Sequence, residues 1–113
     1  MTITVFLASA LLCIGNDCHP ALVGKATPVG RFGMVQRQVA AKGYGGDVMQ
    51  FGDSPRGIFA IHRVWLGRSA EQRAERLAGD NAARRRMVTN GCINVTPAVY
   101  EAIVGETVVD IRP

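Results

Sequence analysis

The sequence predicts a single, mainly β domain over residues 1–113, with one inserted surface helix and a short helix near its C-terminal end. Three observations lead to this fold class. Ile3, Val5 and Leu7 recur at the two-residue period of a strand. Residues 58–66 (IFAIHRVWL) are rich in the β-branched and aromatic side chains that favour strands. Thirteen glycines and five prolines divide the rest into short segments, which favours strands and turns over a helical bundle.

Turn-forming residues separate the strands that we expect in the first half of the chain. Residues 15–17 (GND) have the composition of a turn, and residues 27–30 (TPVG) that of a type I turn. Residues 42–46 (KGYGG) are typical of a loop, and residues 53–57 (DSPRG) of a turn. The short strands or apolar runs expected between these turns cover residues 2–8, 10–14, 21–24, 32–39 and 48–51.

The inserted helix is expected to begin at Ser69, which forms a capping box with Gln72. Its apolar stripe is thin, so the helix should pack lightly and lie on the surface. Gly79 should end it, and residues 80–81 can cap a second short turn. Pro97 at a first helical position predicts the short final helix, and residues 108–111 should close the chain as a strand. The stripe consists of Ala70, Ala74, Leu77 and Ala78.

The formal net charge of +4, with a pI near 9.4, suits an anionic partner without choosing among nucleic acid, an acidic membrane surface and the cell-wall polymer. Much of the positive charge lies between Arg63 and Arg86, either as a solvated helix face or as a binding surface. No stretch approaches the ~20 apolar residues of a membrane span. The apolar start has no preceding basic residue and no small-x-small cleavage site, so we expect a strand there and no signal peptide.

The cysteine count of three is informative. If Cys13 and Cys18 pair across the turn between them, Cys92 is left over, which is typical of a reactive thiol in an oxidising compartment. Facing hairpin positions bring Cβ atoms to about 4.5–5.5 Å, close to what a disulfide needs. The alternative is a metal site that also uses His19, but the spacing C-x4-C-H matches no usual zinc pattern. We therefore expect no metal and no cofactor.

Residues 89–94 (TNGCIN) carry the strongest chemical signal. Gly91 lets the backbone approach a substrate, and the N–H groups of Gly91 and Cys92 could hold an oxyanion. A thiol needs a base or a cation to react well at neutral pH. Since His62 lies in the strongest predicted strand, it is the natural partner. The alternative is structural: a buried cysteine acting as a small hydrophobe beside a core histidine.

This pattern resembles the signature of the L,D-transpeptidase (YkuD-like) family, in which a His is followed later by Ser/Thr-His-Gly-Cys, a hydrophobic residue, and Asn or Arg. Residues 27–32 (TPVGRF) resemble the family's Thr-Pro-x-Gly-x-Phe element, and residues 21–24 and 60–63 the strands around it. The resemblance runs from about Ile3 to the last helix. There are two departures: Asn90 replaces the second histidine, and the stretch between His62 and Cys92 is longer than in the best-known members. The residues that match the signature are His62, Thr89, Gly91, Cys92, Ile93 and Asn94.

The resemblance implies a β-sandwich or barrel-like YkuD fold with the cysteine in a groove. It implies acyl transfer on peptidoglycan stem peptides through a Cys92 thioester, as an L,D-transpeptidase or an L,D-carboxypeptidase. His62 would be base and acid, the Arg63 carbonyl would orient it, and the N–H groups of Gly91 and Cys92 would hold the oxyanion. It further implies acylation of Cys92 by carbapenem inhibitors and a place in the periplasm or cell wall. The substrate-binding residues would be Thr89, Asn90 and Asn94.

Two other functions stay open. The first is a secreted antibacterial toxin that uses the same chemistry. The second is a non-catalytic module that binds the wall, or nucleic acid, through the arginine-rich face between Arg63 and Arg86. That module would explain the charge but not the Gly91-Cys92 pair beside a strand histidine, so we expect an enzyme with no nucleic-acid partner.

Overall fold

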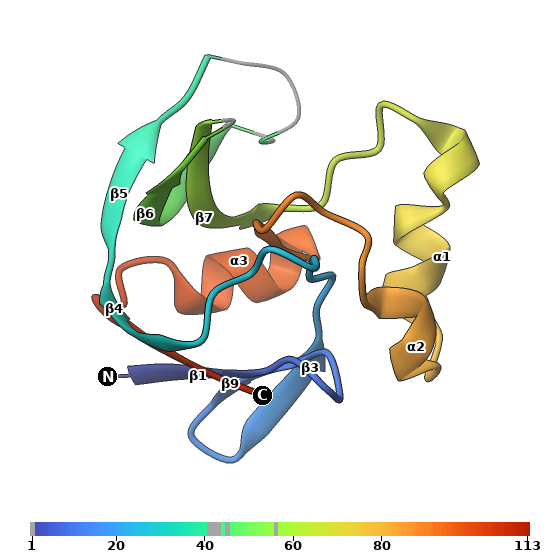
Figure 1. The fold of residues 1–113 in the computed structure, drawn as a ribbon, viewed down its shortest axis with the longest axis horizontal. Coiled ribbons are helices and arrows are strands. Elements are labelled where there is room, and N and C mark those ends of the chain that lie inside the picture. Colours follow the sequence, from blue (N-terminus) through green and yellow to red (C-terminus); the bar gives the residue numbers. More distant parts are fainter. Residues whose placement is uncertain (1, 41–43, 45, 56) are drawn as a thin grey trace.

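The computed structural model describes residues 2–40, 44, 46–55 and 57–113. The strands among these residues form two sheets, and a helix lies between the sheets (Figure 1). The first sheet has the order β3-β2-β1-β9-β4, with β1 and β9 parallel and the other pairs antiparallel. Its strands are β1 (Thr2–Phe6), β2 (Leu11–Ile14), β3 (Asp17–Pro20), β4 (Gly30–Gly33) and β9 (Val108–Arg112).

The second sheet has the order β5-β6-β7-β8, and its β7–β8 pair is parallel. The register places Ile61 opposite Ile93 and His62 opposite Asn94. This pairing brings the histidine strand and the segment after Cys92 side by side, although the long insert separates them in the sequence. The strands are β5 (Val35–Gln38), β6 (Asp47–Ser54), β7 (Gly57–Arg63) and β8 (Ile93–Val95).

The helix between the sheets is α3 (Pro97–Ile103). Pro97 stands in its first turn as predicted, and the Thr96 side chain caps it by accepting the Val99 N–H. Tyr100 and Ile103 are fully buried, and they join apolar side chains from both sheets in one core. Burial of each such side chain contributes about 1.5–3 kcal/mol. The predicted mainly β fold of two packed sheets is therefore confirmed.

The prediction of one strand over residues 32–39 is wrong, because these residues belong to two strands, β4 and β5, which lie in different sheets. The chain crosses from β4 to β5 at Met34, whose N–H donates to the Thr107 carbonyl at 2.8 Å and whose side chain is buried. The turn expected at residues 27–30 lies earlier, because the Thr27 N–H closes a turn by donating to the Gly24 carbonyl at 3.1 Å. β7 ends at Arg63, short of the predicted residue 66.

The inserted helix is broken into a 3-10 helix η1 (Ser69–Glu71), α1 (Arg73–Ala78) and α2 (Ala82–Arg85). The predicted capping box is wrong, because Gln72 adopts a left-handed conformation (φ 51°) that ends η1 and begins α1. Gly79 ends α1, and Asn81 caps α2 by accepting the Ala83 N–H at 3.0 Å. The predictions that Gly79 ends the helix and that residues 80–81 cap a second short turn are therefore confirmed.

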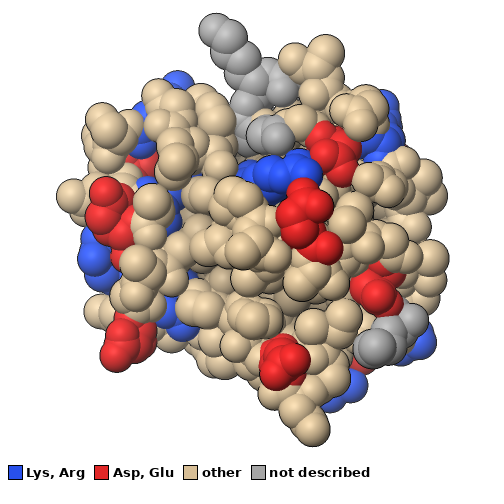
Figure 2. All heavy atoms as spheres, turned by 180° about the vertical axis from the view of Figure 1, so that it is seen from behind, with Lys and Arg blue, Asp and Glu red and all other residues tan. Residues whose placement is uncertain are grey.

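Polar bonds hold this insert more than apolar burial does. In α1 the buried side chain is Leu77, while the alanines of the predicted stripe are exposed. Arg85 is only 4% exposed, and its guanidinium donates to the carbonyls of Ala10, Gly79 and Ser9 at 2.8–3.2 Å. The basic cluster is therefore not a uniformly solvated face. On the side of the molecule seen in Figure 2, acidic and basic side chains are interspersed.

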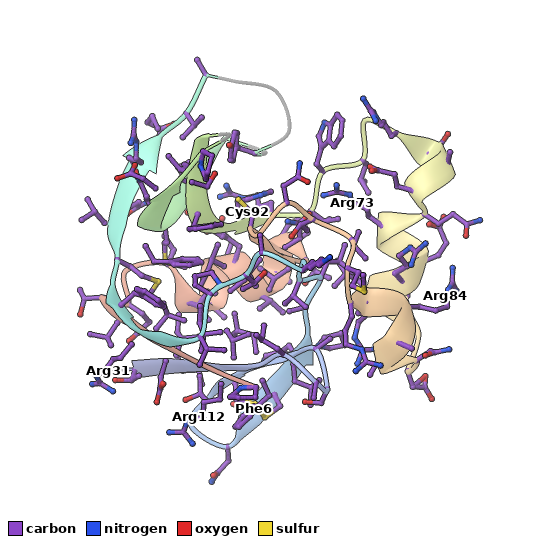
Figure 3. The ribbon with its side chains drawn as sticks, viewed as in Figure 1. Phe6, Arg31, Arg73, Arg84, Cys92 and Arg112 are labelled. Atoms are coloured by element: carbon purple, nitrogen blue, oxygen red, sulfur yellow. A yellow bond between two sulfur atoms is a disulfide. The ribbon has the colours of Figure 1, made fainter. Side chains whose placement is uncertain are left out.

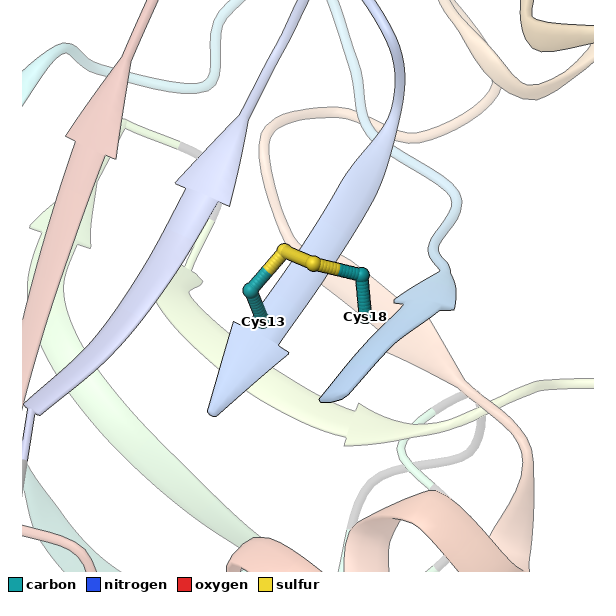
Figure 4. Close-up of a disulfide and its surroundings, with 2 residues drawn as sticks. All are labelled: Cys13 and Cys18. Atoms are coloured by element: carbon teal, nitrogen blue, oxygen red, sulfur yellow. A yellow bond between two sulfur atoms is a disulfide. The ribbon is translucent and has the colours of Figure 1, made fainter. Parts of the chain in front are cut away.

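The predicted disulfide is present. Cys13 and Cys18 occupy facing positions of β2 and β3, and their sulfur atoms are bonded across the hairpin (Figure 4). Both sulfurs are thereby used, which removes the alternative of a metal site with His19. Cys92 keeps a free thiol.

Two predicted connections lie partly outside the described residues. In the loop expected at 42–46, the structure describes Tyr44 and Gly46, which form bends. In the turn expected at 53–57, residue 56 lies outside the described residues, and Ser54 pairs with Gly57 across it. Within the described part of the chain, no helix is long and apolar enough to cross a membrane.

Candidate functional site

Cys92 is half-buried immediately before β8, where the backbone makes a close approach to β7. Its thiol lies 3.3 Å from the Ile58 carbonyl, to which it donates. Gly91 has a φ of 123°, and a Cβ atom there would overlap the Phe59 ring. Only glycine fits this position, so the residue before the thiol is dictated by both conformation and space.

Two threonine hydroxyls brace this segment. Thr27 Oγ1 donates to the Gly91 carbonyl at 2.9 Å and accepts the Gly24 N–H at 3.0 Å. Thr89 Oγ1 donates to the Cys92 carbonyl at 2.6 Å and accepts the Gly91 N–H at 3.1 Å. The Gly91 N–H expected to hold an oxyanion is therefore bonded to Thr89, and it must exchange partners to reach a substrate. Sequence reasoning placed Thr27 in a turn and in the element that resembles Thr-Pro-x-Gly-x-Phe, but gave it no contact with Gly91.

His62 is 3% exposed on β7. Its Nδ1 lies 2.7 Å from the Arg63 carbonyl, the contact expected from the sequence. A carbonyl can only accept, so Nδ1 carries the proton of the neutral ring and Nε2 carries the lone pair. The Tyr44 ring packs edge-on against the imidazole, with 5.2 Å between centroids. Nothing in the sequence marked Tyr44 except an aromatic residue among loop glycines.

Asn94 is fully buried, and both ends of its amide have partners. Its Nδ2 lies 3.3 Å from His62 Nε2, and its Oδ1 accepts from Arg73 Nη1 at 2.8 Å. Arg73 is the first residue of α1, so the insert reaches the site directly. Figure 3 shows Arg73 between α1 and the segment of Cys92. Sequence reasoning counted Arg73 only among the charges of the helix face.

These side chains surround one pocket of ≈ 190 Å³. A second pocket of ≈ 500 Å³ adjoins it, because the two share Ser54, Thr89 and Asn90. Gly91 and Arg63 do not line the first pocket, but their carbonyls bond to Thr27 and to His62. The residues that line the first pocket are Tyr44, Ser54, Ile58, His62, Trp65, Arg73, Thr89, Asn90, Cys92 and Asn94.

The site favours neutral forms of both reactive groups. The pKa of His62 is lowered to about 4, mainly by burial and to a smaller extent by the charge of Arg73. The hydrogen bond to the Arg63 carbonyl acts in the opposite direction and raises this pKa. Burial raises the pKa of Cys92, while a backbone hydrogen bond from Ala60 and the Arg73 charge offset part of that rise. At neutral pH the site thus holds a thiol and a neutral imidazole, which carries its one proton on Nδ1 and can accept a second on Nε2.

A cluster behind β7 fixes the carbonyl that orients His62. The Arg63 guanidinium pairs with Asp47 at 2.8 Å and with Glu101 at 2.7 Å, and it lies 4.2 Å above the Tyr100 ring. The Tyr100 hydroxyl donates to Asp47 at 2.9 Å. The hydrogen bond from Arg63 is the largest cause that lowers the pKa of Asp47 to about 2. The end of β7 is therefore tied to β6 and α3.

No protein-family model and no curated protein matches the sequence. Among solved structures, the crystal structure of L,D-transpeptidase 3 from Mycobacterium tuberculosis in complex with a faropenem-derived adduct is similar, with a TM-score of 0.58 and 14% identity. The alignment covers 99% of this chain, which spans 60% of the length of that structure. At this identity the likeness is one of fold: the two-sheet, mainly β architecture is consistent with a YkuD-like fold.

Proposed function

We propose that the protein is a cysteine-dependent acyltransferase of the L,D-transpeptidase type that acts on peptidoglycan stem peptides. The observation that carries the proposal is that Cys92 and His62 line one pocket, with the His62 Nδ1 proton committed to the Arg63 carbonyl. This leaves Nε2 as the ring atom able to take a proton from the thiol, once it gives up its contact of 3.3 Å with Asn94 Nδ2. The disulfide suits an oxidising compartment such as the periplasm or cell wall, which is part of the proposal.

In the first half-reaction, Cys92 Sγ attacks the carbonyl between the diamino acid and the terminal D-alanine, while His62 Nε2 takes the thiol proton. The peptide C–N bond then breaks, and the imidazolium returns the proton to the leaving amine of D-alanine. In the second half-reaction, an amine of another stem, or water, attacks the thioester and gives its proton to His62. The C–S bond breaks and the thiol is restored.

Because both groups are neutral at rest, the thiol loses its proton as it attacks rather than beforehand. The oxyanion formed in each half-reaction needs donors, and the nearby backbone N–H groups of Gly91 and Cys92 serve this role. For Gly91 this requires exchange of the Thr89 hydroxyl for the oxyanion, at little cost, because one hydrogen bond replaces another. Asn90, at the border of the two pockets, would contact the peptide.

The experiment is incubation with tetrapeptide stems, followed by mass analysis of the products. We expect loss of D-alanine and either a cross-linked dimer or a tripeptide. The Cys92→Ala variant should lose this activity while its circular dichroism spectrum stays unchanged. Faropenem is a second probe: it should add one covalent mass to the protein and none to Cys92→Ala. Turnover retained by a folded Cys92→Ala variant would overturn the proposal.

A further inference from the structure

A chain of three hydrogen bonds crosses the site in one direction. Arg73 Nη1 donates to Asn94 Oδ1 at 2.8 Å, Asn94 Nδ2 lies 3.3 Å from His62 Nε2, and His62 Nδ1 lies 2.7 Å from the Arg63 carbonyl. A guanidinium can only donate and a carbonyl can only accept. The two ends therefore fix the direction of every bond between them.

The orientation of the Asn94 amide is what Arg73 decides. With Oδ1 turned to the guanidinium, the NH2 group faces His62 Nε2, and a donor there matches a lone pair on the ring. Protonation of Nε2 would set two donors against each other inside a buried site. If the amide turned over, Oδ1 would instead accept a proton on Nε2 and stabilise the charged ring. The observed orientation thus favours the neutral imidazole.

We infer that Arg73, supplied by the insert, is a positioning residue that acts through Asn94 to hold His62 neutral, with its Nε2 lone pair facing the Asn94 amide at the wall of the pocket. The guanidinium is itself well placed for this role. It is 11% exposed, pairs with Glu71 at 3.2 Å and lies 5.6 Å from the Trp65 ring centre. The catalytic meaning of this arrangement rests on the proposed function, whereas the hydrogen-bond chain itself does not.

Two simpler roles for Arg73 make different predictions. Its charge could act on His62 through space, without Asn94, or its guanidinium could bind a carboxylate of the substrate. The other ionisable side chains that line the pocket beside His62 are Tyr44 and Cys92, and Glu71 pairs with Arg73. Because these groups stay in place when Arg73 or Asn94 is replaced, a double-mutant comparison can separate the route through Asn94 from the route through space.

The experiment is an NMR titration of the His62 ring in the substrate-free protein, with His19 as an internal reference. Arg73→Met should raise the pKa of His62 by about one unit or more, a tenfold gain in proton affinity. Arg73→Lys keeps a cation that can only donate and should restore the low value. Arg84→Met removes the same charge from an exposed site that points away from Cys92 (Figure 3) and should change nothing.

The decisive variant is Asn94→Leu, which removes the intermediary at nearly constant volume; Asn94→Ala replaces it if that protein does not fold. On this background Arg73→Met should shift the pKa of His62 much less than it does in the wild-type protein, because only the direct effect of the Arg73 charge remains. A shift as large as in the wild-type background would overturn the inference in favour of a through-space charge. An unchanged pKa in Arg73→Met, with only a higher KM for stem peptides, would overturn it in favour of carboxylate binding. Because the titration needs no turnover, failure of the proposed function would leave these outcomes readable.

Discussion

The two sheets and the insert between His62 and Cys92 are stabilised by different physics. The sheets share a core of fully buried aliphatic side chains, with Tyr100 of α3 among them. The insert buries Leu77 and is also held by arginines that donate to backbone carbonyls or to Asn94, and by the Val23 N–H, which donates to the Arg85 carbonyl. Apolar burial resists change cooperatively, whereas a few polar bonds can be removed one at a time. Substitutions in the insert should therefore alter the site without unfolding the domain.

The largest effect is expected in the sheets. Ile61 is fully buried at the centre of β7, between β6 and β8. Ile61→Ala should lower the free energy of unfolding by about 2–5 kcal/mol, through lost transfer energy and the cavity left behind. Urea unfolding should show a lower midpoint with an unchanged slope. A fall below 1 kcal/mol would mean that the sheets do not share one tight core.

The second-largest effect is expected from acid, which should lower the free energy of unfolding through protonation of His62. Its pKa falls from 6.5 to about 4 on folding, so the unfolded chain binds the extra proton between those values. The free energy of unfolding should therefore decrease as the pH drops from 6.5 to 4, by up to ~3 kcal/mol. Denaturant midpoints measured across this range test the direction. His62→Gln should flatten this part of the profile, and an equally steep profile in that variant would assign the effect to other groups.

A smaller and local effect is expected at Arg85. Arg85→Met removes three bonds to carbonyls near the β1–β2 connection and at the end of α1. We expect a loss of about 1–3 kcal/mol, since the hydrogen bonds of a buried charged donor are removed. Amide hydrogen exchange should accelerate in α1 and α2 but not in β1, β7 or β9. Uniform acceleration throughout the chain would show that the insert and the sheets unfold together.

The sheets could be predicted from the sequence because strand period and turn residues are local signals. Ile3 and Val5 alternate with polar residues as a strand requires. The strand predicted over residues 58–66 corresponds to β7, which ends three residues earlier, at Arg63. The crossover at Met34 could not be predicted, because residues 34–38 (MVQRQ) contain no glycine, proline or other turn former that would mark the change of sheets. The break at Gln72 was missed because a helical sequence pattern continues through that residue, where the structure adopts a left-handed conformation.

The residues of the candidate site likewise fall into those that a local motif predicts and those that depend on contacts in the folded chain. Cys92, His62 and the Arg63 carbonyl follow from a motif, and the structure brings the first two to one pocket. Arg73 carries no comparable local pattern, and the pattern around Thr27 indicates a turn but not its contact with Gly91. Their roles depend on contacts with Asn94 and Gly91, which are distant in sequence and form only after the chain has folded. Sequence reasoning also treated the arginines of the insert as one face, although Arg85 is buried.

The smallest effect separates those arginines. Arg84 and Arg86 are exposed, and within the described part of the chain the Arg84 side chain bonds to Gln72 at 3.1 Å. The double variant Arg84→Gln/Arg86→Gln should change the free energy of unfolding by less than about 0.5 kcal/mol, because exposed polar contacts contribute little. If these two charges attract the acidic wall polymer, the variant should raise KM for stem peptides at low salt and lose that difference at high salt, where the Debye length is only a few ångströms. An unchanged KM at low salt would make them solvated side chains, and a large loss of stability would contradict the division between buried Arg85 and its exposed neighbours.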